Sequence, residues 1–115
     1  MKLRIEDDTL RLRLSGSELQ EFATTGRVVS SVHFGAGAGQ QLAYALERGS
    51  EMAQTAPLAE PVQVYYEPGA ITVRVPFALA KAWVETDQNG FSHVLPLAEN
   101  QQLTVLVEKD LDCRH

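Results

Sequence analysis

Two stretches, KLRIEDDTLRLRLS at residues 2–15 and QVYYEPGAITVRVP at residues 63–76, follow the same pattern 61 positions apart. In each stretch apolar and polar residues alternate, a turn follows, and the alternation resumes, which is typical of a half-buried β-hairpin. The second turn, EPGA at residues 67–70, has the stronger turn chemistry, since proline presets φ and glycine accepts positive φ. The two predicted hairpins indicate a chain built from two similar halves.

The similarity extends along the whole chain. Shifted by 61 positions without a gap, residues 2–54 align with residues 63–115, and the paired segments include SELQEFATTG with ALAKAWVETD and QQLAYALER with QQLTVLVEK. The first pair predicts short helices, and Ser15 with Glu18 forms a capping box at the start of the first one. Further strands are predicted at residues 28–34, 41–48, 91–97 and 102–109. We therefore predict a tandem duplication of a ββαββ unit.

This pattern predicts an α+β fold with antiparallel sheets, two short helices and a pseudo-twofold axis. A half of this size is too small to bury a core of its own, so Phe22 and Trp83 of the two helices are expected to pack in one shared core. Residues 1–115 are then a single domain. Its expected parts are repeat 1 at about 2–48, a linker at 49–61, repeat 2 at about 62–109 and a tail at 110–115.

Composition limits the classes of partner. The chain of 115 residues has a formal net charge of −5, whereas nucleic acids and acidic membranes attract clustered positive charge, so we predict neither as a partner. The single cysteine, Cys113, excludes an internal disulfide, and the first residues lack the apolar run of a signal peptide. We expect a cytoplasmic protein without a cofactor. A homodimer is left open.

A basic patch is the first candidate site. Four residues of the first hairpin alternate with its apolar residues: Lys2, Arg4, Arg11 and Arg13. This spacing places them on one face, so we predict that the patch binds an anion. The second half carries a different set at the matching positions: Gln63, Tyr65, Thr72 and Arg74. The alternative is a solvated strand face whose charges pair laterally with Glu47, Glu108 or Asp110.

Three residues form a candidate metal set: His93, Cys113 and His115. Imidazole and thiolate bind zinc, but a structural zinc site takes four ligands with paired close spacings, which this set lacks. By repeat phase His93 matches Val32 and is expected on the core side, where a hydrogen-bonded histidine is the favoured alternative. His33 lies one position out of phase with His93, so the two are expected on opposite sheet faces.

Two loops also stand out in the sequence. The polar stretch Asp87, Gln88, Asn89 and Gly90 follows the second helix and differs most from the first half, which makes it a candidate recognition loop. The stretch HFGAGAGQQ at residues 33–41 precedes a strand rather than a helix, so a hairpin loop is favoured over a phosphate-binding loop. The sequence contains no Gly-x-Ser-x-Gly, His-Glu-x-x-His or nucleotide-binding fingerprint.

Several segments carry a family resemblance: LRLRLS followed by SELQEFATTG, then ITVRVP, AWVETDQNGF and LTVLVEKDLDC. With these segments the chain resembles a family of small uncharacterised bacterial proteins, in which the patterns TDQxGF and LVEKDFxC are expected. Leu111 stands here at the aromatic position of the second pattern. The resemblance covers most of the chain and implies no activity, cofactor or partner.

We interpret the sequence as a non-catalytic accessory or binding protein of the bacterial cytoplasm that recognises a protein or a small anionic ligand. The alternative is a small metal-binding protein or enzyme. If the repeat is taken to begin at Leu10 instead of Lys2, the order becomes βαβββ twice with one strand exchanged. This order resembles that of the glyoxalase-like folds, whose cleft carries divalent-metal chemistry. The inward positions are mostly leucine, valine and isoleucine, with His93 the exception, so they supply no facial set of histidine and glutamate.

Overall fold

The computed structural model describes residues 1–50 and 62–110, and within them the order ββαββ occurs twice. The first half contains β1 (Lys2–Glu6), β2 (Thr9–Leu14), α1 (Gly16–Thr25), β3 (Arg27–His33) and β4 (Gln41–Arg48). The second half contains β5 (Gln63–Glu67), β6 (Ala70–Val75), α2 (Phe77–Glu85), β7 (Gly90–Pro96) and β8 (Gln102–Lys109). The predicted α+β class and element order are confirmed. The predicted linker lies mostly outside the described residues.

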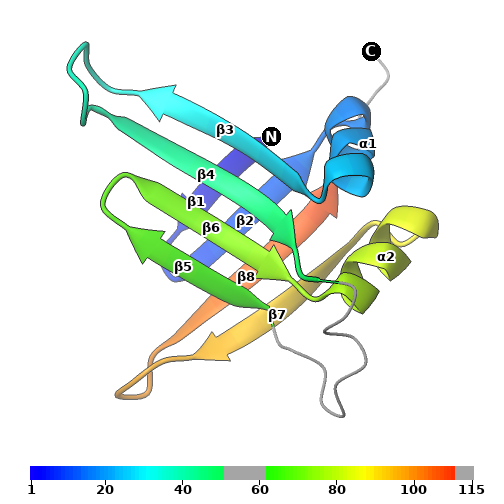
Figure 1. Ribbon diagram of the computed structural model, residues 1–115. Coiled ribbons are helices and arrows are strands. Elements are labelled where there is room, and N and C mark those ends of the chain that lie inside the picture. Colours follow the sequence, from blue (N-terminus) through cyan, green and yellow to red (C-terminus); the bar gives the residue numbers. More distant parts are fainter. Residues whose placement is uncertain (51–61, 111–115) are drawn as a thin grey trace.

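The two halves exchange hairpins between two mixed sheets (Figure 1). Sheet A has the order β1-β2-β8-β7 and sheet B the order β3-β4-β6-β5, so each sheet joins one hairpin of each half. The hairpins are antiparallel, but the central pairs β2–β8 and β4–β6 are parallel, which the sequence analysis did not predict. The hairpins are exchanged because α1 leads from β2 in sheet A to β3 in sheet B, and α2 leads from β6 in sheet B to β7 in sheet A.

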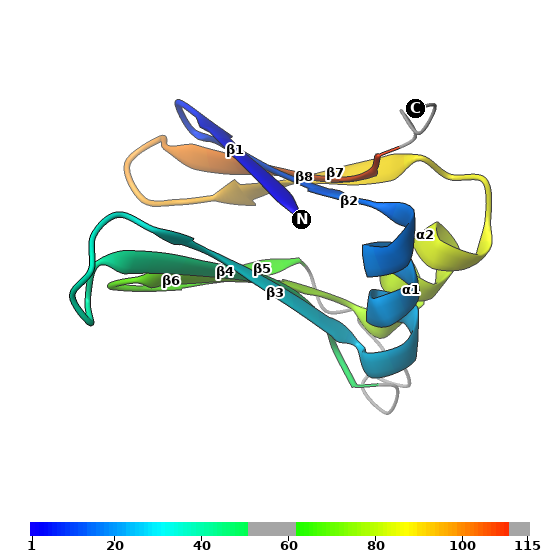
Figure 2. The same cartoon turned by 90° about the horizontal axis from the view of Figure 1, so that it is seen from above.

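The two sheets lie face to face, with both helices at one end and the four hairpin turns at the other (Figure 2). Alternation along β2 buries Leu10, Leu12 and Leu14 between the sheets, as a period of two requires. At the helix end Phe22 and Trp83 are fully buried, and their ring centroids lie 5.9 Å apart in an edge contact. The shared core predicted from these two residues is confirmed.

The first helix begins and ends as its residues predict. The Ser15 side chain accepts from the Glu18 backbone N–H while the Glu18 carboxylate accepts from the Ser15 N–H, which completes the capping box. Gly26 ends the helix at φ 81°, a left-handed conformation that glycine adopts without strain. These local signals fix where the chain leaves sheet A and enters sheet B.

The gapless alignment of the halves is wrong in the closing hairpins. Arg27 lies opposite Glu47 in sheet B, whereas the residue opposite Glu108 in sheet A is Gly90. Glu108 follows Glu47 by 61 positions, but Gly90 follows Arg27 by 63. Four residues separate α2 from β7, against one between α1 and β3, and the loop at 97–101 is two residues shorter than the loop at 34–40.

Candidate functional site

The four basic residues of the first hairpin line one pocket on the outer face of sheet A, with a volume of about 110 Å³. Strand alternation brings them there, because the neighbouring residues Leu10, Leu12 and Leu14 take the inner positions. The structure thus gathers Lys2, Arg4, Arg11 and Arg13 as the spacing predicts.

Within this pocket the β1–β2 register places like charges directly opposite each other. Arg4 is the cross-strand partner of Arg11, and Lys2 is the partner of Arg13. Side chains at such positions have their Cβ atoms about 4.5–5.5 Å apart, and like charges there destabilise a sheet. The second hairpin avoids this arrangement, because Gln63 faces Arg74 and Tyr65 faces Thr72 in the matching register.

Three carboxylates, from β1 and from the end of β8, surround the basic residues. The Asp110 carboxylate lies 2.9 Å from Lys2 Nζ, Glu6 lies 3.5 Å from Arg4 Nη2, and Glu108 lies 3.1 Å from Arg13 Nη2. Lateral pairing with Glu108 and Asp110 is what the alternative interpretation predicted. The four bases and three carboxylates leave one positive charge in excess.

Arg11 is the least satisfied member of the group. Its Nε is buried and has no hydrogen-bond partner, and its nearest carboxylate oxygen, on Glu108, lies at 3.7 Å, beyond hydrogen-bond range. Its side chain is 33% exposed, against 66% for Arg4. A buried donor without an acceptor is costly, so Arg11 is the position at which an added anion would contribute most.

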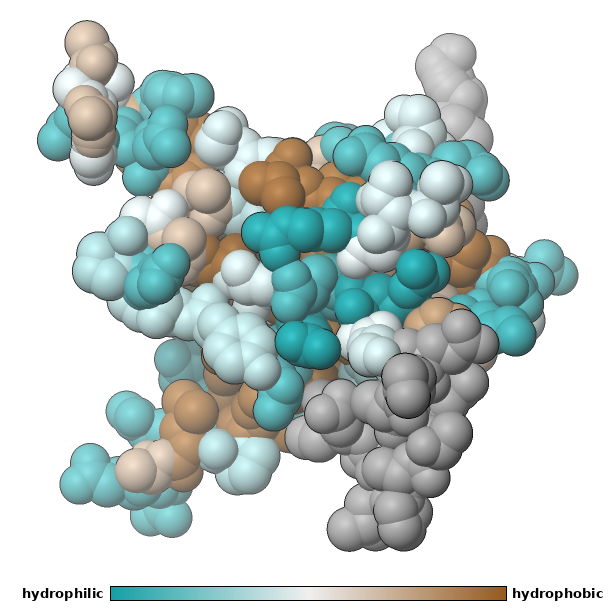
Figure 3. All heavy atoms as spheres, in the orientation of Figure 1, coloured by the Kyte–Doolittle hydropathy of each residue, from teal (hydrophilic) through white to brown (hydrophobic). Residues whose placement is uncertain are grey.

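The matching face of sheet B carries a different charge arrangement. Glu47 pairs there with Arg27 and, at 3.6 Å, with Arg74, and Glu47 is the residue that Glu108 follows by 61 positions. Figure 3 shows this face, with hydrophilic side chains across the middle of the sheet. Each sheet therefore holds one glutamate between two arginines, and only sheet A adds the further cations Lys2 and Arg4 on β1.

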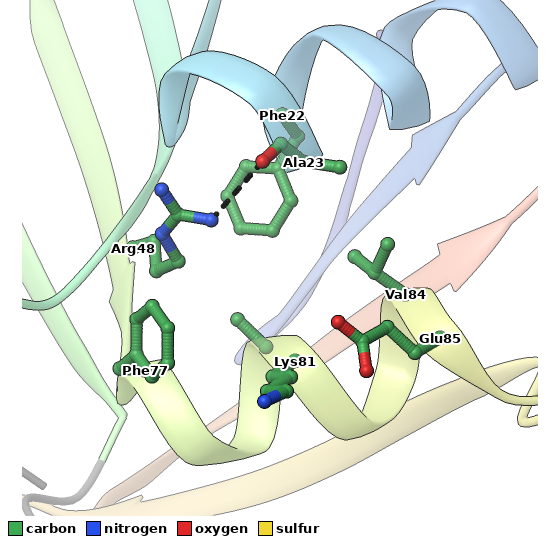
Figure 4. Close-up of a pocket in the computed structure, with 8 residues that line it drawn as sticks. Phe22, Ala23, Arg48, Phe77, Lys81, Val84 and Glu85 are labelled. Carbon is green, nitrogen blue, oxygen red and sulfur yellow. Dashed lines mark hydrogen bonds between the residues drawn. The ribbon is translucent and has the colours of Figure 1, made fainter. Parts of the chain in front are cut away.

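A second pocket, of about 160 Å³, lies between α1 and α2 (Figure 4). Arg48 reaches it from the end of β4: its Nη1 donates to the Ala23 carbonyl at 3.2 Å, and its guanidinium lies 5.2 Å from the Phe77 ring centroid. Lys109, at the matching position, donates from Nζ to the Thr86 carbonyl at 2.8 Å. Both residues satisfy carbonyls at helix C-terminal ends, so the fold accounts for them. This role was not predicted from the sequence, although the basic residues at matching positions of the two halves are a signal for it.

The candidate recognition loop is tied into the fold. The Asn89 carbonyl accepts from the Trp83 indole N–H at 3.0 Å and from the Lys109 backbone N–H at 2.8 Å. A Cβ at Gly90 would lie 2.5 Å from the Val107 carbonyl oxygen, so only glycine fits there. Gln88 donates to the Gly90 carbonyl, while Asp87 is exposed. Recognition by this loop stays a prediction.

The candidate metal residues are placed only in part. His93 lies opposite Val105 on the core side of β7, half-buried, and His33 is exposed on β3, so they take opposite faces as predicted. Cys113 and His115 lie outside the described residues. Within residues 1–50 and 62–110 there is no cluster of three or more histidine, cysteine, aspartate or glutamate side chains suited to a metal ion.

Comparison with known proteins identifies a family whose function is unknown. The sequence matches one family over residues 1–115. The chain belongs to DUF7009, a family of unknown function. This agrees with the resemblance seen in the sequence. No match was found among curated proteins or among solved structures. In the described part of the chain, neither helix has the length and apolar character needed to cross a bilayer.

Proposed function

We propose that the protein is a non-catalytic binding protein that holds a small anionic group, a carboxylate or a phosphate, in the basic pocket of sheet A. The observation that carries this proposal is the pairing of Arg4 with Arg11 and of Lys2 with Arg13 in the β1–β2 register. An anion between them would turn two repulsive pairs into attractive contacts.

The donor set suits such a ligand. Guanidinium groups present forked donors that match the oxygens of carboxylate and phosphate, and these bonds are charge-assisted. The buried Nε of Arg11 has no acceptor within the described residues, and a ligand oxygen would supply one. A pocket of about 110 Å³ suits a single anionic group rather than a large ligand.

The surrounding carboxylates limit the expected affinity for the anion. Glu108 and Asp110 already pair with Arg13 and Lys2, so a ligand competes with them for the same donors. The net attraction then rests on one excess positive charge and on Arg11. We expect weak binding that falls as salt rises, because exposed charges are screened within about 8 to 10 Å.

The test is a titration with inorganic phosphate, and separately with acetate, followed by the NMR signal of the Arg11 Nε–H at low ionic strength. We expect a saturable shift in the parent protein and affinity at least about fivefold weaker in Arg11→Gln, monitored at Arg13. The matched control is Arg74→Gln, which removes an arginine of similar exposure to Arg11 from the other sheet. Equal losses in both variants, or a shift that never saturates, would contradict the proposal.

The wider setting belongs to the same proposal. The family resemblance supports a bacterial accessory protein, and the acidic composition with a single cysteine supports the cytoplasm. The repeated element order supports an internal duplication in which one half gained the basic pocket.

A further inference from the structure

The sandwich is not closed at the end where the four hairpin turns lie. Ile5 and Tyr66 occupy inner-face positions on β1 and β5, yet they are 58% and 73% exposed. Along β2 and β6 the same inward alternation buries Leu10 and Val73. Both helices lie at the opposite end of the sandwich, so neither of them covers these inner positions (Figure 2).

A slot of about 220 Å³ opens between the sheets at this end. Its apolar walls come from both halves: Ile5, Leu10 and Leu103 on the sheet A side, and Val64 and Ile71 on the sheet B side. Binding pockets for drug-sized molecules run from about 300 Å³ upward, so this slot suits a short chain or a single ring.

The hairpin turns at this end of the sandwich are acidic. The four hairpin turns contain Glu6, Asp7, Asp8, Glu67 and Glu99, all exposed, and no lysine or arginine. Glu6 pairs with Arg4 on the outer face, while the other four have no ion pair within the described ranges. Asp7 lines the slot itself, and so does Tyr66.

The apolar walls of the slot, together with Asp7 and Tyr66, favour one class of ligand. A carboxylate attracts a cation, and an aromatic face within about 6 Å of a cation adds further attraction. An anionic ligand would be repelled by the same carboxylates. We propose that the slot between the sheets binds a short apolar chain that carries a positive charge, the chemistry of a primary alkylammonium, with its chain between the sheets and its ammonium beside Asp7 and Tyr66.

The experiment compares three probes with one chain length: octylammonium, octanol and octanoate, each below its micelle concentration. Methyl NMR signals of Ile5, Leu10, Ile71 and Leu103 report the slot. We expect saturable shifts with octylammonium and binding to the slot at least fivefold weaker for octanoate. This site is independent of the basic pocket, where octanoate would act through its carboxylate, so the two proposals succeed or fail separately.

Two variants locate the charge. Asp7→Asn removes the carboxylate while keeping a residue that accepts the positive φ of 52° found there. It should weaken octylammonium binding about two- to fivefold and leave octanol unchanged. Tyr66→Leu should weaken octylammonium by a similar factor. The matched control, Asp87→Asn, removes an exposed carboxylate beside α2 at the other end and should change neither probe.

Three outcomes would overturn the proposal. Octanoate binding in the slot as tightly as octylammonium would remove the charge argument, and so would an unchanged affinity in Asp7→Asn. Unmoved slot methyls with every probe would show that nothing of this class enters. Sedimentation at several protein concentrations tests whether a second copy of the chain occupies the slot instead. Dimerisation that shifts the Ile5 and Tyr66 signals would show that it does.

Discussion

Each of the two outer sheet faces has one glutamate beside two arginines, and the two faces differ in what surrounds it. On sheet B, Glu47 lies between Arg27 and Arg74. Tyr65 and Thr72, which face each other on β5 and β6, are uncharged. On sheet A, Glu108 lies between Arg11 and Arg13, and two like-charge pairs stand beside it. The shared glutamate therefore belongs to the architecture, and the added cations mark the face with a separate role.

The largest predicted effect tests the core that the two halves share. Trp83→Ala should lower the free energy of unfolding by about 3 to 5 kcal/mol, because the side chain is fully buried and contacts the Phe22 and Phe91 rings. Urea titration measures it. Phe22→Ala, the matching change in α1, should cost a similar amount. A cost below about 1 kcal/mol for Trp83 would mean that the two helices do not share one core.

The next effect tests the register difference between the closing hairpins. Gly90→Ala should destabilise the protein by roughly 1 to 3 kcal/mol, because the new Cβ would lie 2.5 Å from the Val107 backbone carbonyl, which cannot move freely. The control is Gly16→Ala, where nothing lies within 4 Å of the new Cβ and the helix gains a better former. Similar thermal stability of both variants would show that Gly90 does not pack against β8.

A third change converts the first hairpin to the pattern of the second. The triple variant Lys2→Gln, Arg4→Tyr, Arg11→Thr copies the residues found at 63, 65 and 72. We expect saturable phosphate binding to disappear while the free energy of unfolding changes by less than about 1 kcal/mol, since the lost ion pairs are at least partly exposed and the like-charge contacts disappear. Loss of folding in circular dichroism would show that these cations serve the architecture instead.

The smallest effect concerns pH and the capping box, which the first helix has and the second lacks. Burial raises the pKa of Glu18, but hydrogen bonds from the Met1 ammonium and the Ser15 N–H outweigh it and leave the pKa below its ordinary value of 4.5. A carboxyl with a lowered pKa stabilises the fold above its unfolded-state pKa, and this contribution is lost as pH falls through the lower, folded-state value.

Glu18→Gln, which keeps a capping-box residue type, should therefore flatten the loss of stability below about pH 4.5. Urea midpoints at several pH values measure it, with Glu21→Gln on the exposed face of the same helix as the control. An acid profile unchanged from the parent would mean that Glu18 gains nothing from its ionised form.

Local signals in the sequence were sufficient for most of the elements. Alternation predicted the hairpins, and Ser15 with Glu18 predicted the start of α1, because each signal acts within a few residues. The candidate basic face was also readable, since alternate residues of a strand share a face wherever the strand lies. The pairing of Glu6 with Arg4 was not predicted: the two residues lie two positions apart on one strand face, whereas the predicted pairs were between strands.

By itself the sequence determined the repeated ββαββ order, the buried pair Phe22 and Trp83, and the common face of the four cations. Only the tertiary structure decided the exchange of hairpins between sheets, the parallel central pairs and the slot lined by Ile5 and Tyr66. Strand alternation specifies which side chains face inward, but it does not specify which strand lies alongside. That choice depends on how the two helices carry the chain from one sheet to the other.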